Sequence, residues 1–140
     1  MKEVTILYPV LAHIVLVLGL YILLGLRKSS AVKSKSIDLK KSSLDNRAWP
    51  SSVVQVSNNI ASQFELPMLF YALCFITLLT GASNILAISL AWSYVALRYF
   101  HSYIHAGSNF VPYRFRAFVV SLLIIIVLLV QVTVQMASQF

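Results

Sequence analysis

Hydrophobic residues form four long runs along this chain, and polar residues gather between the runs and along one side of two of them. The runs predict helices over about residues 4–26, 51–80, 84–107 and 112–136, with a basic link over residues 27–50. Each run approaches the roughly 20 residues that carry a helix across about 30 Å of hydrocarbon, and none alternates like a membrane-spanning strand. We therefore expect an all-α protein whose residues 1–140 form one membrane domain of four transmembrane helices.

The composition of the chain is that of a membrane protein. Of its 140 residues, 59% are hydrophobic and 11% are charged, against roughly 45–50% and about 25% in an ordinary soluble domain. A chain of this size cannot bury such an excess in its own core, so the excess must face lipid. A soluble globule and a disordered chain are both excluded.

Positive charge is concentrated in one link. The net charge is +7, and seven of the eleven Lys and Arg residues lie between Arg27 and Arg47, beside apolar runs. Basic links of this kind lie in the cytoplasm, so we expect both termini on the outer side. The same placement argues against nucleic acid as a partner and predicts contact with membrane lipid.

Polar residues of the second predicted helix share one face, because they are spaced by three or four positions. The face comprises Gln55, Asn58, Ser62 and Glu65, and it is flanked by Asn59 and Gln63. Glu65 lies two residues before Pro67, which removes the backbone donor for the carbonyl of Gln63 and predicts a kink.

The third predicted helix carries a matching polar face. Its members are Tyr94, Arg98, His101, His105 and Asn109, and Tyr99 and Tyr103 form a neighbouring ridge. With the expected orientation, both polar faces lie toward the cytoplasmic ends of their helices, level with Arg114 and Arg116. The two faces are therefore expected to meet in one polar region of the bundle.

Glu65 and Arg98 are the only acid and the only base within the apolar spans. A charge in the bilayer costs at least about 2.5–3.5 kcal/mol, so it usually faces protein or water and finds a partner. We expect these two side chains to be linked, directly or through one bridging group. Asn58, Ser62 and Ser102 are expected to hold helices together, and His13 is expected to be a packed histidine.

Several of these residues resemble the MAPEG family, the membrane-associated proteins in eicosanoid and glutathione metabolism. The resemblance starts with the long basic link and continues through Glu65-Leu66-Pro67-Met68-Leu69-Phe70. The stretch Arg98-Tyr99-Phe100-His101-Ser102-Tyr103 resembles the family's Arg-Tyr-Phe-x-x-Tyr motif. The longer run of Arg98, His101-Ser102, His105, Asn109 and Arg114-Phe115 resembles a bacterial branch of the family, which implies a bacterial inner membrane.

The resemblance implies a left-handed, up-down four-helix bundle that assembles as a homotrimer and binds glutathione in clefts between subunits. Glu65 then corresponds to the acid that holds the glutathione amine, and Asn58 or Asn59 to the amide of the same helix. Arg114, Arg116 and Tyr103 are the expected catalytic residues, with a basic side chain stabilising the thiolate. The other expected substrate-binding residues are Arg98, Tyr99, His101, His105 and Asn109.

The sequence also departs from the eicosanoid enzymes at this site. They place the acid three residues before the proline, whereas Glu65 precedes Pro67 by two, and Phe110 stands where an ungapped alignment puts the thiolate-activating arginine. A glutathione-dependent transferase or peroxidase acting on lipophilic substrates is the leading functional interpretation.

Other functions are compatible with the same residues. The main alternative is a non-catalytic protein of the same fold that binds a lipid or another small anionic ligand. A small proton-coupled transporter that uses Glu65 as its proton site is a third. We expect no metal, because His101 and His105 have the i, i+4 spacing without a matching carboxylate or cysteine motif. A haem held by His13 and His101 is disfavoured as well, because the expected orientation puts His13 nearer the outer half of the bilayer.

Overall fold

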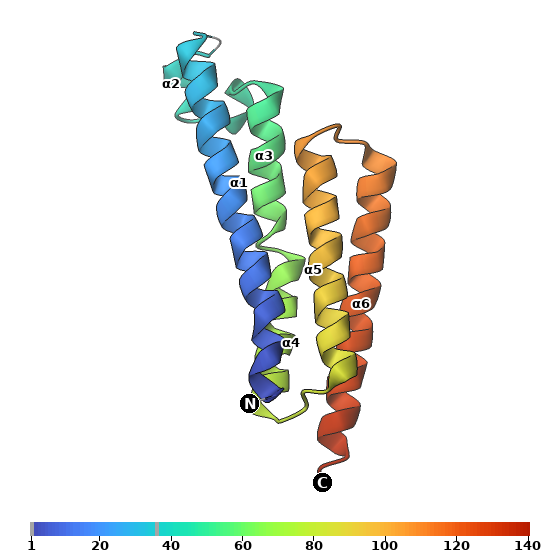
Figure 1. Ribbon diagram of the computed structural model, residues 1–140. Helices are drawn as coiled ribbons and strands as arrows, with labels where there is room; N and C mark the ends of the chain where they lie inside the picture. The colour runs from blue at the N-terminus through green and yellow to red at the C-terminus, as the bar shows by residue number, and fades with distance from the viewer. Residues whose placement is uncertain (1, 36) are drawn as a thin grey trace.

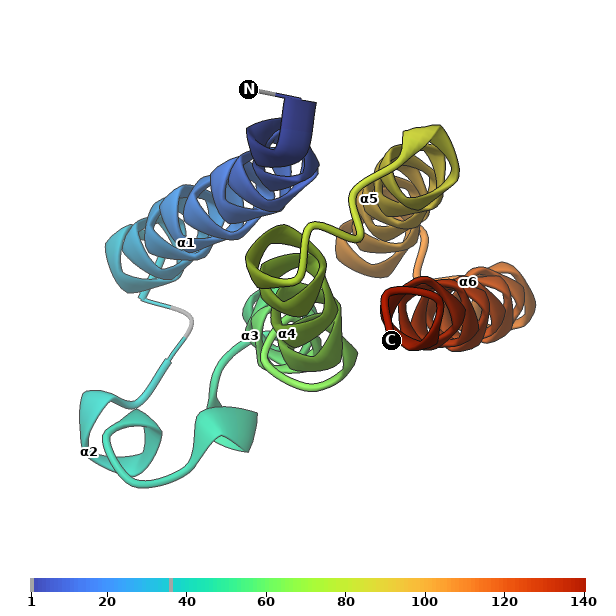
Figure 2. The ribbon, with the colours of Figure 1, turned by 90° about the horizontal axis from the view of Figure 1, so that it is seen from below.

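The computed structural model of this protein describes residues 2–35 and 37–140, and every regular element in these ranges is helical. α1 rises through the bundle, α3 and α4 descend, α5 rises and α6 descends, so both termini lie at the same end (Figure 1). The combined α3–α4 column packs against α1, α5 and α6 (Figure 2). The elements are η1 (Lys2–Ile6), α1 (Leu7–Lys33), α2 (Leu39–Ser42), η2 (Asn46–Ala48), α3 (Ser51–Ser62), α4 (Leu66–Leu79), α5 (Ile85–Ala106) and α6 (Val111–Ala137).

Three helical stretches among the described residues are long and apolar enough to cross a membrane: Glu3–Lys33, Ser51–Leu79 and Val111–Ala137. The fourth expected crossing, α5, has 22 residues and at 1.5 Å per residue spans about 33 Å. It is less apolar because it carries the predicted polar face. Arg98, His101 and His105 are all buried inside the bundle, so α5 keeps these polar side chains away from lipid.

The second predicted helix is broken rather than kinked. α3 ends at Ser62 and α4 begins at Leu66, so residues 63–65 are outside both helices. Pro67 has no N–H to donate, and its ring clashes with the carbonyl four residues earlier, which prevents a continuous helix here. The break separates the environments of two nearby polar residues: Gln63 is buried in the bundle, whereas Glu65 is exposed.

The basic link is shorter than expected and contains short helical turns. α1 continues to Lys33 instead of ending near residue 26, so residues 27–33 belong to a helix and not to the link. Two aspartates then cap short helical turns: Asp38 accepts a hydrogen bond from the backbone N–H of Lys40 at 3.0 Å, and Asp45 from that of Arg47 at 2.9 Å. Such side-chain caps replace partners that the first turn of a helix lacks.

The interior contains two apolar clusters and a set of buried polar side chains. The larger hydrophobic cluster lies at the end that holds both termini, where Phe70 stacks on Tyr94 with ring centroids 4.4 Å apart. A smaller cluster around Leu20, Val56 and Ile60 lies toward the opposite end. Buried polar side chains of α1, α3 and α5 occupy the space between the two clusters.

Candidate functional site

Gln63 is the centre of a buried hydrogen-bond network. Its Oε1 accepts from His13 Nε2 at 2.9 Å and from Arg98 Nε at 3.3 Å. Its Nε2 donates to Asn59 Oδ1 at 2.9 Å and to Ser102 Oγ at 3.0 Å. One side chain at the helix break thereby joins α1, α3 and α5.

Asn59 and Ser102 close this network between α3 and α5. Asn59 Nδ2 donates to the backbone carbonyl of Ser102 at 3.2 Å, and Ser102 Oγ donates to Asn59 Oδ1 at 3.2 Å. On the other side, His13 Nδ1 is hydrogen-bonded to the hydroxyl of Tyr71. Buried polar groups that are mutually satisfied rigidify a core, so this network fixes the position of the helix break.

Arg98 is 1% exposed, and its guanidinium finds hydrogen-bond partners at the helix break. Its Nη2 donates to the hydroxyl of Ser62 at 3.1 Å and to the carbonyl of Ser62 at 3.4 Å. That carbonyl ends α3 and has no helical partner in the next turn. Ser62 also lines a cavity together with Glu65, so a link between Arg98 and Glu65 would run through Ser62.

That cavity, of about 230 Å³, lies where the α3–α4 break faces α5 and α6. We refer to it as the Arg114 cavity. Glu65 lines it from the break, and His101 and His105 line it from α5. Its lining residues are Ser62, Glu65, His101, His105, Val111, Arg114, Phe115 and Phe118. An acid, a base and two imidazoles thus converge beside an apolar wall.

The side chains of the Arg114 cavity are only partly satisfied by the protein. Arg114 Nη1 donates to Asn109 Oδ1 at 2.6 Å, which fixes one side of the guanidinium. Asn109 itself has φ +53, a left-handed conformation that asparagine tolerates better than most residues. His101 and His105 are 5% and 6% exposed, yet the Nδ1 atom of each has no hydrogen-bond partner among residues 2–35 and 37–140. Buried polar atoms usually have a partner, so these two nitrogen atoms are candidates to contact a bound ligand.

The structure thus unites four of the predicted site residues, Glu65, His101, His105 and Arg114, in one cavity. Asn109 serves it indirectly by holding Arg114. The remaining predicted residues lie elsewhere: Asn58 and Arg116 are exposed, Asn59 and Arg98 belong to the buried network, and Tyr99 and Tyr103 line a separate cavity.

Tyr99 and Tyr103 face a different part of the bundle from Arg114. Tyr99 donates its hydroxyl hydrogen to the backbone carbonyl of Ala12 at 2.6 Å, and Tyr103 is 81% exposed. The i, i+4 ridge of the sequence therefore exists, but within one protomer it lies away from the Arg114 cavity.

The hydrogen bond between Gln63 and His13 is not predictable from the local sequence. The sequence places Gln63 only beside the polar face, and it predicts a packed His13, which the 0% exposure of His13 confirms. The two residues are 50 positions apart, so helical spacing does not relate them. A local signal does exist for the helix break: Gln63 precedes Pro67 by four residues, where the helix must open.

The fold and the cavity together define a multi-pass, helical membrane protein with a polar site near one end of its bundle. Residues 5–134 match the MAPEG family, so the chain belongs to this family and has its four-helix membrane-bundle fold. The family includes glutathione transferases and peroxidases, and its members commonly use glutathione. No curated protein and no solved structure shows a significant match to the chain.

Proposed function

We propose that this protein is a glutathione-dependent transferase or peroxidase that acts on lipophilic substrates in the Arg114 cavity. The observation that carries the proposal is the convergence of Glu65, Arg114, His101 and His105 in one cavity of a membrane protein of this family. Charged side chains at membrane depth are costly and usually mark a functional site. In the expected orientation this end of the bundle is cytoplasmic, in keeping with a bacterial inner-membrane protein.

The chemistry of the lining residues fits glutathione. This tripeptide has two carboxylates, one amine and one thiol, and it therefore needs cationic or N–H donors and one acid. Arg114 supplies donors for a carboxylate or a thiolate, Glu65 supplies an acceptor for the amine, and the orphaned Nδ1 atoms of His101 and His105 supply further polar partners. Charge-assisted hydrogen bonds of this type are short and roughly twice as strong as neutral ones.

Each residue then has a definite role. When bound, glutathione would supply the sulfur nucleophile of the reaction. Arg114, with one side held by Asn109, presents its remaining N–H groups to the sulfur and favours the thiolate. Glu65 orients the amine end, and the network behind Arg98 and Ser62 holds the break that presents Glu65 to the cavity.

The apolar wall of the cavity suits a substrate that arrives from lipid. Val111, Phe115 and Phe118 line it, and they are 58%, 63% and 37% exposed. An open site of this kind can be closed by a second copy of the chain, which agrees with the homotrimer implied by the family resemblance. The lipophilic substrate would then approach along α6, beside the sulfur-binding end of the cavity.

A non-catalytic role is the second candidate. It is favoured by the separation of Tyr103 from the Arg114 cavity and by Phe110, which occupies the position of an expected arginine. In that case the same cavity would bind a small anionic ligand without activating a thiol.

Conjugation of glutathione to a chromogenic electrophile tests the proposed function. We expect the detergent-purified protein to catalyse this reaction, and Glu65→Gln to raise KM for glutathione by about tenfold or more, since a hydrogen bond to a charged group contributes roughly 1.5–3 kcal/mol. The change leaves kcat less affected, because Glu65 binds the amine and not the sulfur.

Asn58→Ala is the control for Glu65→Gln, because Asn58 is exposed and does not line the cavity. Its kinetic constants should match those of the unmodified protein. Absence of conjugating and peroxidase activity, together with saturable glutathione binding, would reject the enzyme and favour the binding protein.

A further inference from the structure

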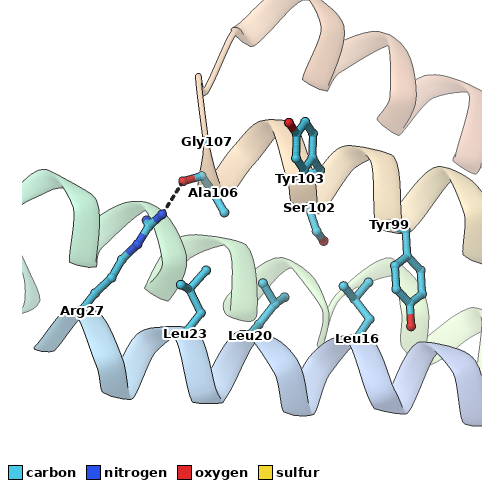
Figure 3. A pocket seen from close by; sticks show the side chains of 9 residues that line it. All are labelled: Leu16, Leu20, Leu23, Arg27, Tyr99, Ser102, Tyr103, Ala106 and Gly107. Atoms are coloured by element: carbon cyan, nitrogen blue, oxygen red, sulfur yellow. Dashed lines mark hydrogen bonds between the residues drawn. The ribbon is translucent and has the colours of Figure 1, made fainter. Parts of the chain in front are cut away.

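A second cavity lies between α1 and α5 and shares no lining residue with the Arg114 cavity (Figure 3). Its volume is about 390 Å³, within the range of roughly 300–1,000 Å³ typical of small-molecule sites. Leu16, Leu20 and Leu23 form its floor along α1, and Tyr99 and Tyr103 border it on α5. Its lining is mostly apolar, and one charged side chain, Arg27, closes one end.

Arg27 also lines a polar cavity of about 310 Å³ that continues beyond it. The residues of this polar cavity are Arg27, Ser30, Ala31, Ser34, Pro50 and Ser52. The guanidinium is fixed between three helices: Nη1 donates to the carbonyl of Ser52 at 2.7 Å, and Nη2 donates to that of Ala106 at 2.8 Å. A guanidinium has five N–H donors, so these two bonds leave donors for a ligand.

The boundary between the two cavities lies at the end of α5, where the edge of the bilayer is expected. Arg27 contacts Ala106, the last residue of α5, whose 22 residues are just sufficient to cross the hydrocarbon. At the same end, the ammonium of Lys28 lies 4.9 Å from the ring centroid of Trp49, and tryptophan with basic residues is typical of the membrane–water interface. The apolar cavity is therefore at acyl-chain depth, and the polar cavity is at headgroup depth.

We propose that the α1–α5 cavity and the adjoining polar cavity form one binding site for an anionic phospholipid. One acyl chain lies along Leu16, Leu20 and Leu23, and the phosphate lies between Arg27 and the serines beyond it. The site is separate from the Arg114 cavity and does not depend on the function proposed for that cavity. A phospholipid bound in this site would be a structural ligand that contacts both α1 and α5.

Charge decides which lipid fits. The segment from Arg27 to Arg47 carries seven basic residues and two acidic ones, Asp38 and Asp45, and both aspartates cap backbone N–H groups. Basic pockets between transmembrane helices on the cytoplasmic side are suited to anionic headgroups. A zwitterionic lipid has a positively charged group beside its phosphate. This group would be repelled by the basic surface, so a zwitterionic lipid is disfavoured.

Native mass spectrometry of the detergent-purified protein tests this site, with phosphatidylglycerol and phosphatidylcholine of identical acyl chains as probes. We expect each subunit to retain one phosphatidylglycerol about fivefold or more over phosphatidylcholine. Both lipids offer the same phosphate to Arg27, but only phosphatidylcholine carries a cation that the basic link repels, and one such charge is worth about 1 kcal/mol near the membrane surface. Arg27→Gln should reduce retention by about tenfold, the ratio given by one charge-assisted hydrogen bond. Leu23→Trp, which fills the apolar cavity, should reduce it with either headgroup.

Matched variants separate this site from general lipid adsorption. Arg47→Gln removes the same charge from an exposed position of the link, and Leu26→Trp adds the same ring to a side chain that is 64% exposed and lines neither cavity. Both should retain phosphatidylglycerol as the unmodified protein does. Equal retention of the two lipids, or undiminished retention by Leu23→Trp, would overturn the proposal, and so would a loss with Arg47→Gln as large as with Arg27→Gln.

Discussion

Replacing Gln63 with leucine is expected to lower the free energy of unfolding in detergent by about 3 kcal/mol. The figure assumes that each hydrogen bond of Gln63 contributes roughly 0.6 kcal/mol, the average within a membrane protein. Gln63 takes part in five hydrogen bonds, to His13, Arg98, Ser102 and two atoms of Asn59. Leucine has a similar size, so the loss arises from the orphaned partners rather than from a cavity. Unfolding by a denaturing detergent, followed by circular dichroism, measures the change.

Asn58→Leu is the control for this prediction. It also replaces an amide by leucine on the same helical column, but Asn58 is exposed. Its effect should stay within about 0.5 kcal/mol, as for most surface substitutions. Equal stabilities of the two variants would show that the network around Gln63 does not hold the bundle together.

Arg114→Met is expected to lower kcat/KM for glutathione conjugation by about 100-fold, the lower end of the range for removing one donor to a developing negative charge. The reason is that Arg114 is the only arginine or lysine lining the cavity among the described residues, and that it is already oriented by Asn109. Methionine keeps the length of the side chain and its packing. Steady-state kinetics with varied glutathione separates the loss in kcat from the loss in binding.

Arg116→Met removes the same charge two residues later, from an exposed side chain outside the Arg114 cavity. This variant should keep kcat/KM within a small factor of that of the unmodified protein. The sequence alone treated the two arginines as equivalent candidates, so the comparison tests a distinction that the fold makes. A larger loss with Arg116→Met than with Arg114→Met would remove Arg114 from the proposed role.

The helical bundle and its membrane character were accessible from the sequence. Hydrophobic runs of sufficient length and the basic link are properties of local composition, and the family match over residues 5–134 confirms the resemblance. The polar spacing on α5 also placed Arg98, His101 and His105 on an inward face, and all three are buried. The sequence located the break only as a kink at Pro67, because a proline shows where a helix is weakened and not whether neighbouring contacts keep it open.

The candidate site was less accessible because its membership depends on contacts between helices. Glu65 and Arg98 are expected to be linked because they are the lone charges of the apolar spans, but which side chain lies between them depends on the helix break: Ser62 hydrogen-bonds to Arg98 and lines the same cavity as Glu65. Tyr99 and Tyr103 share α5 with His101 and His105, yet a helix presents different faces to α1 and α6, and helical spacing alone does not say which face meets which neighbour. Gln63 became central through partners that lie far away in sequence.

Isothermal titration of the purified protein with glutathione tests most directly whether the Arg114 cavity binds glutathione. We expect saturable binding of one glutathione per subunit, competition by an S-alkyl analogue, and weaker binding after either Glu65→Gln or Arg114→Met. The absence of both heat and competition in the unmodified protein would contradict this expectation, and so would binding that neither variant weakens.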